Sequence, residues 1–167
     1  MFVVSVKSSK LKSAAIVMIA IVFATIGAVY FVSKNADKPV AKQGGIILKA
    51  STAEERTAFF SQFGWEINEE PCEVKEVVIP EEFDDVYTAY NAIQKEQGLD
   101  LEKYQGARAK LWSYEIKNYP GYENSQGVIH GNILVYDGVI IGGDVSSVEL
   151  DGFMHGFYPP DKADKGG

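Results

Sequence analysis

The chain has 167 residues, of which 46% are hydrophobic, 23% are charged and one is a cysteine. This composition excludes collagen-like, disulfide-stapled and fully disordered proteins. The net charge of −7 is unevenly distributed: the first 33 residues hold three lysines and no acid, and the remainder holds 13 basic and 23 acidic residues. The chain after residue 33 is strongly acidic and has no cluster of cations that could bind a polyphosphate backbone. We therefore expect no nucleic-acid partner.

An uncharged apolar run extends from Ala14 to Val32. As a helix it would measure about 28 Å, close to the hydrocarbon thickness of a bilayer. A cleavable signal peptide is the alternative, but its apolar core is usually shorter, about 7 to 15 residues, and ends in a small-x-small site. We therefore predict that residues 1–33 form a short cytoplasmic tail and a transmembrane anchor, through which the chain contacts the membrane.

The flanks of this run do not decide its orientation, because three lysines lie on each side. A short N-terminal tail is easily retained, whereas long C-terminal domains translocate largely regardless of charge. We expect a single-pass protein of the cell membrane with a cytoplasmic N-terminus and an extracytoplasmic C-terminal domain. A flexible linker is expected at residues 34–45, the domain at 46–158 and a disordered tail at 159–167.

Two helices are predicted in the first half of the domain. Ser51-Thr52-Ala53-Glu54 has the form of a capping box, which predicts a helix with an apolar stripe of phenylalanines up to Phe63. A second helix is predicted after Asp84, where acids occupy the first turn, and Gly98 marks its end.

The second half of the domain changes to period-two patterns that are typical of strands. Trp112, Tyr114 and Ile116 alternate with polar residues, and Val128–Tyr136 and Val139–Val145 flank the type I′ turn signal Asp137-Gly138. A further strand is predicted at Val74–Ile79. We therefore predict one small α+β domain, an antiparallel sheet with two helices packed on one face.

Three glycines fall inside the predicted hairpin. A two-residue turn would place Gly131 opposite Asp144 and Gly142 opposite Ile133, with Gly143 beside them. Glycine weakens a strand, so this cluster indicates a bulge or the close approach of a ring, another backbone or a ligand. We select Gly131, Gly142, Gly143 and Asp144, together with His130 on the same strand as Gly131, as candidate contacts of a ligand or partner.

Packing by one of the domain's own aromatic rings is the alternative interpretation of these glycines. We predict that Gly142→Val destabilises the domain by more than about 1 kcal/mol, because Gly142 is expected to share its sheet face with the side chains of Ile133 and Ile140.

The remaining chemistry-bearing residues do not form a recognisable site. His130 and His155 are the only histidines, and neither has a metal-ligand partner at helical spacing. The single Cys72 is interpreted as a buried small hydrophobe. No Gly-x-Ser-x-Gly elbow or phosphate-binding glycine loop occurs. We expect no catalytic residue, no metal and no cofactor.

Several short motifs carry a resemblance to a known family. In chain order they are Phe63-Gly64-Trp65-Glu66, Ile79-Pro80 ahead of Phe83, Tyr87-x-x-Tyr90-Asn91, Gln97-Gly98-x-Asp100-Leu101, Tyr104-x-Gly106, Asn118-Tyr119-Pro120 and Gly142-Gly143-Asp144. Over residues 51–156 the chain resembles an uncharacterised domain-of-unknown-function family from Gram-positive anaerobic bacteria. The resemblance implies one N-terminal membrane segment ahead of an extracytoplasmic domain, and it implies no activity.

These observations predict a membrane-tethered extracytoplasmic binding or protein-interaction module in envelope or sporulation physiology, with an unknown protein or envelope component as its partner. An envelope-acting hydrolase and a purely structural assembly component are the alternatives. An enzyme is less favoured, because no nucleophile and base can be paired from the sequence.

Overall fold

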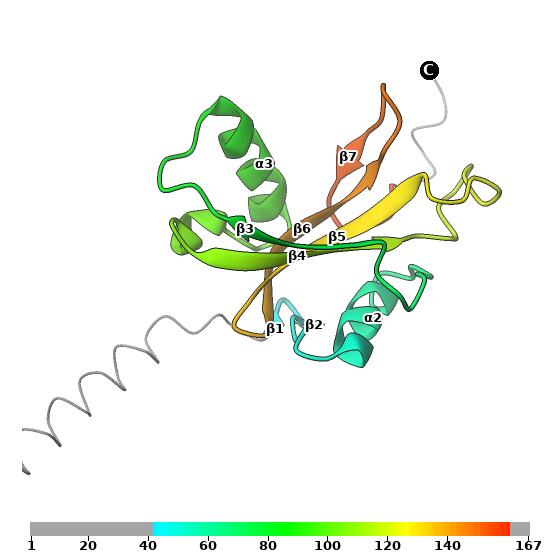
Figure 1. Ribbon diagram of the computed structural model, residues 1–167, viewed down its shortest axis with the longest axis horizontal. Helices are drawn as coiled ribbons and strands as arrows, with labels where there is room; N and C mark the ends of the chain where they lie inside the picture. The colour runs from blue at the N-terminus through cyan, green and yellow to red at the C-terminus, as the bar shows by residue number, and fades with distance from the viewer. Residues whose placement is uncertain (1–41, 161–167) are drawn as a thin grey trace, which may run out of the picture. The chain divides into compact units, whose positions relative to one another are not determined.

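The computed structural model describes residues 42–160, which contain a five-stranded antiparallel sheet, two α-helices and one 3-10 helix (Figure 1). The elements are β1 (Lys42–Gln43), β2 (Ile46–Ile47), α2 (Ala53–Ser61), β3 (Glu73–Val78), α3 (Asp85–Glu96), η1 (Leu101–Tyr104), β4 (Arg108–Glu115), β5 (Ile129–Tyr136), β6 (Val139–Ser147) and β7 (Met154–His155). The sheet has the order β3-β4-β5-β6-β7, and β1 and β2 form a separate hairpin. The predicted α+β class is confirmed.

The predicted anchor from Ala14 to Val32 lies outside the described residues. So do residues 34–41 of the predicted linker and 161–167 of the predicted tail. The last linker residues, 42–45, belong to the β1–β2 hairpin. Within residues 42–160, no helix is both long and apolar enough to cross a membrane.

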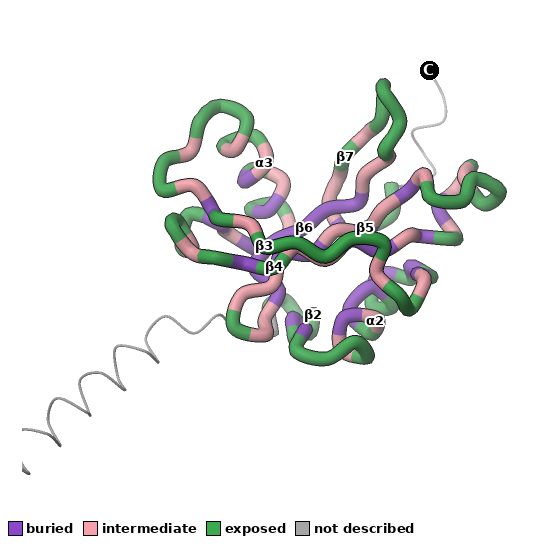
Figure 2. The backbone as a smooth tube through the Cα atoms, viewed as in Figure 1, coloured by how far each residue is buried: buried purple, intermediate pink, exposed green. Residues whose placement is uncertain are grey.

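The two helices lie on opposite faces of the sheet, so the expectation that both pack on one face is wrong (Figure 1). Successive strand residues point to opposite faces. Ile133 belongs to the core cluster that contains Phe59 and Phe60 of α2, whereas the next residue, Leu134, belongs to the cluster against which Tyr90 of α3 packs. Both faces of the central strands are therefore covered, and burial is concentrated there (Figure 2).

The helix starts are set by caps. α3 begins where predicted, because the side chain of Asp84 accepts a hydrogen bond from the Tyr87 amide. The capping box of α2 lies one residue later than predicted: Thr52 is the N-cap and Glu55 its partner. The Glu55 carboxylate also accepts from the Ser51 amide at 2.8 Å, so both residues before the helix are bound by Glu55.

The predicted hairpin is confirmed, but its register is not the predicted one. Asp137 and Gly138 have φ angles of 49° and 77°, as a type I′ turn requires, and Tyr136 pairs with Val139. A bulge then shifts the pairing by one residue, so Gly131 pairs with Val145 and Gly142 with Leu134. Gly142 therefore faces α3 and not the side of Ile133.

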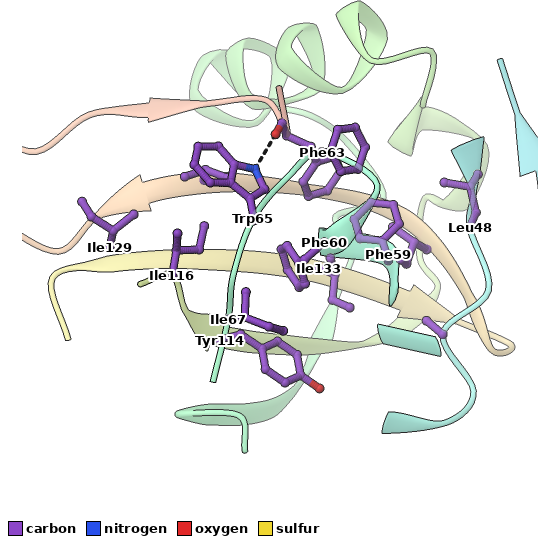
Figure 3. Close-up of a cluster of buried hydrophobic side chains, with 14 of the residues drawn as sticks. Leu48, Phe59, Phe60, Phe63, Trp65, Ile67, Tyr114, Ile116, Ile129 and Ile133 are labelled. Atoms are coloured by element: carbon purple, nitrogen blue, oxygen red, sulfur yellow. Dashed lines mark hydrogen bonds between the residues drawn. The ribbon is translucent and has the colours of Figure 1, made fainter. Parts of the chain in front are cut away.

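Aromatic side chains fill the core beneath α2 (Figure 3). Phe59 packs edge-on against Phe157, with ring centroids 4.7 Å apart, and Phe60 packs edge-on against Tyr114. The indole N–H of Trp65 donates to the Phe157 carbonyl at 2.6 Å. These contacts fix α2 and the segment after β7 onto one face of the sheet.

Candidate functional site

The three candidate glycines are not gathered on one surface. Gly131 and Gly143 lie on the α2 face, where a Cβ atom would meet the rings of Phe60 and Phe157 respectively. On the opposite face, a Cβ at Gly142 would lie 3.0 Å from Leu101 and 3.2 Å from the Gln94 side chain. Each position is thus covered by the chain's own side chains, as the packing interpretation expects. Contact of these glycines with a partner stays a prediction.

Asp144 is buried on the α3 face within a polar network. Its carboxylate accepts from the Asn132 amide at 2.8 Å and from the Tyr90 hydroxyl at 3.0 Å. The Asn132 amide group also contacts Ser113 and Ser146. Burial raises the pKa of Asp144, although these hydrogen bonds act in the opposite direction. The network therefore holds a carboxyl that protonates more readily than an exposed one.

This pKa direction predicts a pH-dependent contribution to stability. Because the folded-state pKa of Asp144 is raised, its contribution is complete below the ordinary value of 3.8 and is lost as the pH rises through the folded pKa. Relative to Asp144→Asn, which cannot ionise, the wild-type chain should lose stability as the pH rises from 4 to 7. Urea denaturation at both pH values measures the difference, and parallel pH profiles for the two proteins would contradict it.

His130 contacts Cys72, a pairing that the sequence did not suggest. The thiol lies 3.9 and 4.0 Å from the two ring nitrogens, and Cys72 is exposed, so its interpretation as a buried residue is wrong. Partial desolvation, with Glu115 and Glu73 nearby, raises the pKa of the thiol. A raised pKa disfavours the thiolate, and with it nucleophilic catalysis. Within residues 42–160, no group of three or more acidic, His or Cys side chains could hold a metal ion.

A different site forms between α2, β4 and the edge of the sheet. A cavity of about 420 Å³ opens there, and we call it the Arg56 pocket. Its lining residues are Ala50, Ser51, Arg56, Glu76, Arg108, Ala109, Lys110, Trp112, Val135, Asp137 and Gly138. Alternate residues of β4 point to the same face of the sheet, and Tyr114 points toward α2. Lys110 and Trp112 therefore lie on the same side as this helix.

Arg56 is only 7% exposed and is surrounded by neutral groups. Its Nε donates to the Tyr114 hydroxyl at 2.8 Å and its Nη1 to the Ala50 carbonyl at 3.1 Å. The guanidinium stacks on Trp112, with Cζ 3.7 Å from the ring centroid. No ion pair of the described residues involves Arg56. Hydrogen bonds from the backbone and Thr52 lower the pKa of the fully exposed Glu54, and the charge of Arg56 is a minor further cause.

Arg56 lines the pocket, and one end of its guanidinium has no partner among the described residues. Nη2 has no hydrogen-bond partner among residues 42–160. In the same segment no fully buried side-chain nitrogen or oxygen lacks a partner, so Nη2 retains some exposure to solvent. Lys110 is exposed in the same lining and forms none of the ion pairs seen in this part of the chain. Two cationic groups, a buried arginine held by hydrogen bonds and an exposed lysine, thus line one pocket and can attract an anion.

Arg56 was not predicted as a site residue, although the sequence carries a signal for it. Arg56, Phe59, Phe60 and Phe63 are spaced at i, i+3, i+4 and i+7, so a basic residue occupies the apolar stripe of its helix. A charged residue in a buried stripe needs a specific environment, because burial of an uncompensated charge is costly.

Comparison with known proteins places the chain in a family. The family model described as Domain of unknown function (DUF4830) matches residues 59–145, which run from α2 into β6. Glu76, Arg108, Lys110 and Trp112 of the pocket lie within the match, and Arg56 lies three residues before it. No curated protein and no solved structure matches the chain. Since the matched segment is more than half of the sequence, the chain belongs to the DUF4830 family of proteins with a domain of unknown function.

Proposed function

We propose that the chain is a membrane-tethered extracytoplasmic binding module whose domain takes an anionic oxygen group, a carboxylate or a phosphate, in the Arg56 pocket. The observation that carries the proposal is the accessible Nη2 group of a buried arginine that no carboxylate of residues 42–160 neutralises. An anion at Nη2 would supply the missing counter-charge in a partly desolvated place, where such contacts are stronger than at an open surface.

The net charge of the chain favours a ligand with an isolated anionic group. The net charge of −7 repels long polyanions, whereas a single carboxylate or phosphate experiences mainly the local field of Arg56 and Lys110. The apolar run from Ala14 to Val32 supports tethering, and the acidic domain is consistent with contact to the membrane through that run alone.

Titration of the full chain in detergent micelles with N-acetylglutamate amide, and separately with inorganic phosphate, tests this function. NMR should show saturable shifts of the Arg56 Nε–H and of the Trp112 indole N–H. Lys110→Met removes one exposed cation without a hydrogen-bonded partner and should weaken binding about fivefold, the effect of roughly 1 kcal/mol. Lys103→Met removes the same charge from η1 and serves as the matched control.

The two variants separate site binding from general electrostatics. Equal weakening by Lys110→Met and Lys103→Met would show that the anion responds to net charge only. The absence of saturable shifts at Arg56 and Trp112 would contradict the proposed function.

A further inference from the structure

The strand β3 forms one edge of the sheet and is exposed along nearly its whole length (Figure 2). It has six residues, whereas β7 at the opposite edge has two. A long exposed edge presents unpaired backbone groups and is a template for another strand. β3 is therefore the larger of the two strand-pairing surfaces of the sheet that the structure describes.

The backbone pairing shows which groups of β3 face outward. The Ile79 amide donates to the Ala107 carbonyl at 2.9 Å, which continues the β3–β4 register and makes this a hydrogen-bonded pair. Hydrogen-bonded pairs recur at every second residue, so Glu73, Lys75 and Val77 bond to β4. The N–H and C=O groups of the alternate residues, which are Val74, Glu76 and Val78, therefore point away from the sheet.

The same alternate residues lie on the α2 face. Val77 packs into the cluster on the α3 side, so Val74, Glu76 and Val78 have their side chains on the opposite side. Val74 and Val78 are 46% and 54% exposed, which is unusual for valine on a strand. An added strand would cover these two apolar side chains while it satisfied the outward backbone groups.

The Arg56 pocket reaches this edge. Glu76 of β3 lines it together with Lys110 and Trp112 of β4, and Val74 pairs directly with Trp112. Glu76 is already paired with Arg108 at 2.8 Å, so Lys110 and Arg56 are the cations left for a ligand. A residue that lies opposite Val74 on an added strand would be in one row with Val74, Trp112 and the guanidinium stacked on Trp112.

We propose that the partner is an extended peptide segment that pairs with β3 and places an acidic side chain in the Arg56 pocket. This inference rests on the proposed function and specifies its ligand. The backbone pairing provides affinity that does not depend on sequence, and the acid provides selectivity. A peptide with one acid meets the cationic pocket without the repulsion that the net charge of −7 imposes on a polyanion.

A defined peptide tests the proposal. The probe is the acetylated and amidated heptapeptide Thr-Val-Thr-Val-Thr-Glu-Thr, which in antiparallel pairing places its Glu opposite Val74 and its valines opposite Glu76 and Val78. The full chain in detergent micelles is titrated with it by NMR. We expect saturable shifts of the Val74, Glu76 and Val78 amides together with the Trp112 indole. A Glu-to-Gln peptide should bind about fivefold more weakly, as expected for the loss of one ion pair.

Two controls address the backbone pairing. A peptide that is N-methylated at the alternate residues facing β3 keeps every side chain but loses the donors, and we expect no binding. Val74→Pro removes an outward N–H that β4 does not use, so the fold should tolerate it while peptide binding is lost.

The following results would overturn the proposal that a peptide strand is added to β3. Shifts at Trp112 without shifts along β3, or full binding of the N-methylated peptide, would show that no strand is added. In that case a response of the pocket to N-acetylglutamate amide would leave the proposed function intact. A dimer of the chain that Val74→Pro dissociates would assign the edge to a second copy, and phosphate polymers that bind more tightly than the peptide would assign the pocket to a polyanion.

Discussion

Gly131→Ala is expected to destabilise the domain by about 3 kcal/mol, the upper part of the range for overpacking. The added Cβ would overlap the Phe60 ring, which is fully buried and held edge-on against Phe59 and Tyr114. Gly142→Ala meets only Leu101 and Gln94 side-chain atoms at 3.0 Å or more, so its cost should be smaller. Urea denaturation of the full chain in detergent, followed by tryptophan fluorescence, measures both.

A second substitution separates ring overlap from a general strand effect. Phe60→Leu makes room at Gly131, so the double variant should lose less stability than the sum of the two single variants. Gly143→Ala should not be rescued by Phe157→Leu, because its Cβ would also overlap the backbone oxygen of Asn132. Additive effects at Gly131 and Phe60, or equal costs at Gly131 and Gly142, would contradict this packing.

Disruption of the apolar run is expected to release the chain from the membrane. Val22→Arg combined with Phe23→Arg places two charges at the centre of the predicted anchor, at a cost of about 5 to 7 kcal/mol on an insertion scale. The double variant should appear in the soluble fraction after alkaline extraction, whereas Val22→Leu should stay with the membrane pellet. Recovery of the wild-type chain without detergent would contradict the anchor.

The exposed thiol of Cys72 provides a test of orientation, because it is the only cysteine of the chain. A membrane-impermeant maleimide should label intact cells that produce the protein, and Cys72→Ser should abolish labelling. The raised pKa of the thiol slows the reaction at neutral pH, so labelling should accelerate at alkaline pH. Labelling only after lysis would show that the domain faces the cytoplasm.

Local signals in the sequence predicted the turns and helix starts at which the residue type restricts the backbone conformation or caps free amides. Asp137-Gly138 predicted the hairpin because few residues other than Asn, Asp and Gly adopt positive φ at both turn positions. Asp84 predicted the start of α3 for a similar reason, since its short carboxylate can bond the first free amides.

The arrangement of the layers was not predicted, because pairing and packing depend on distant residues. The buried pairs Ile133-Leu134 and Ile140-Ile141 contain the signal of a sheet covered on both faces, but period-two alternation alone does not say which face each helix covers. The glycines of the hairpin indicated that a bulge could occur, but they did not show where it lies. The bulge shifts the register so that Gly131 does not pair with Asp144.

None of the residues that line the Arg56 pocket was predicted as a site residue. Asp144 was selected for its place beside the glycines of the hairpin; it lies in a buried polar network, and its contact with a partner stays a prediction. The Arg56 pocket escaped prediction because its three walls come from α2, the sheet edge and the β5–β6 turn, which only the fold brings together. The contact of Cys72 with His130 likewise joins residues 58 positions apart.

A crystal structure of the chain with N-acetylglutamate amide tests the central claim most directly. We predict that the carboxylate of this probe lies in the Arg56 pocket, with one oxygen accepting a hydrogen bond from Arg56 Nη2 and the other facing Lys110, while Nε and Nη1 keep their bonds to Tyr114 and Ala50. A pocket left empty at saturating probe, with the guanidinium turned onto Glu54 of its own chain, would contradict an anion site at Arg56.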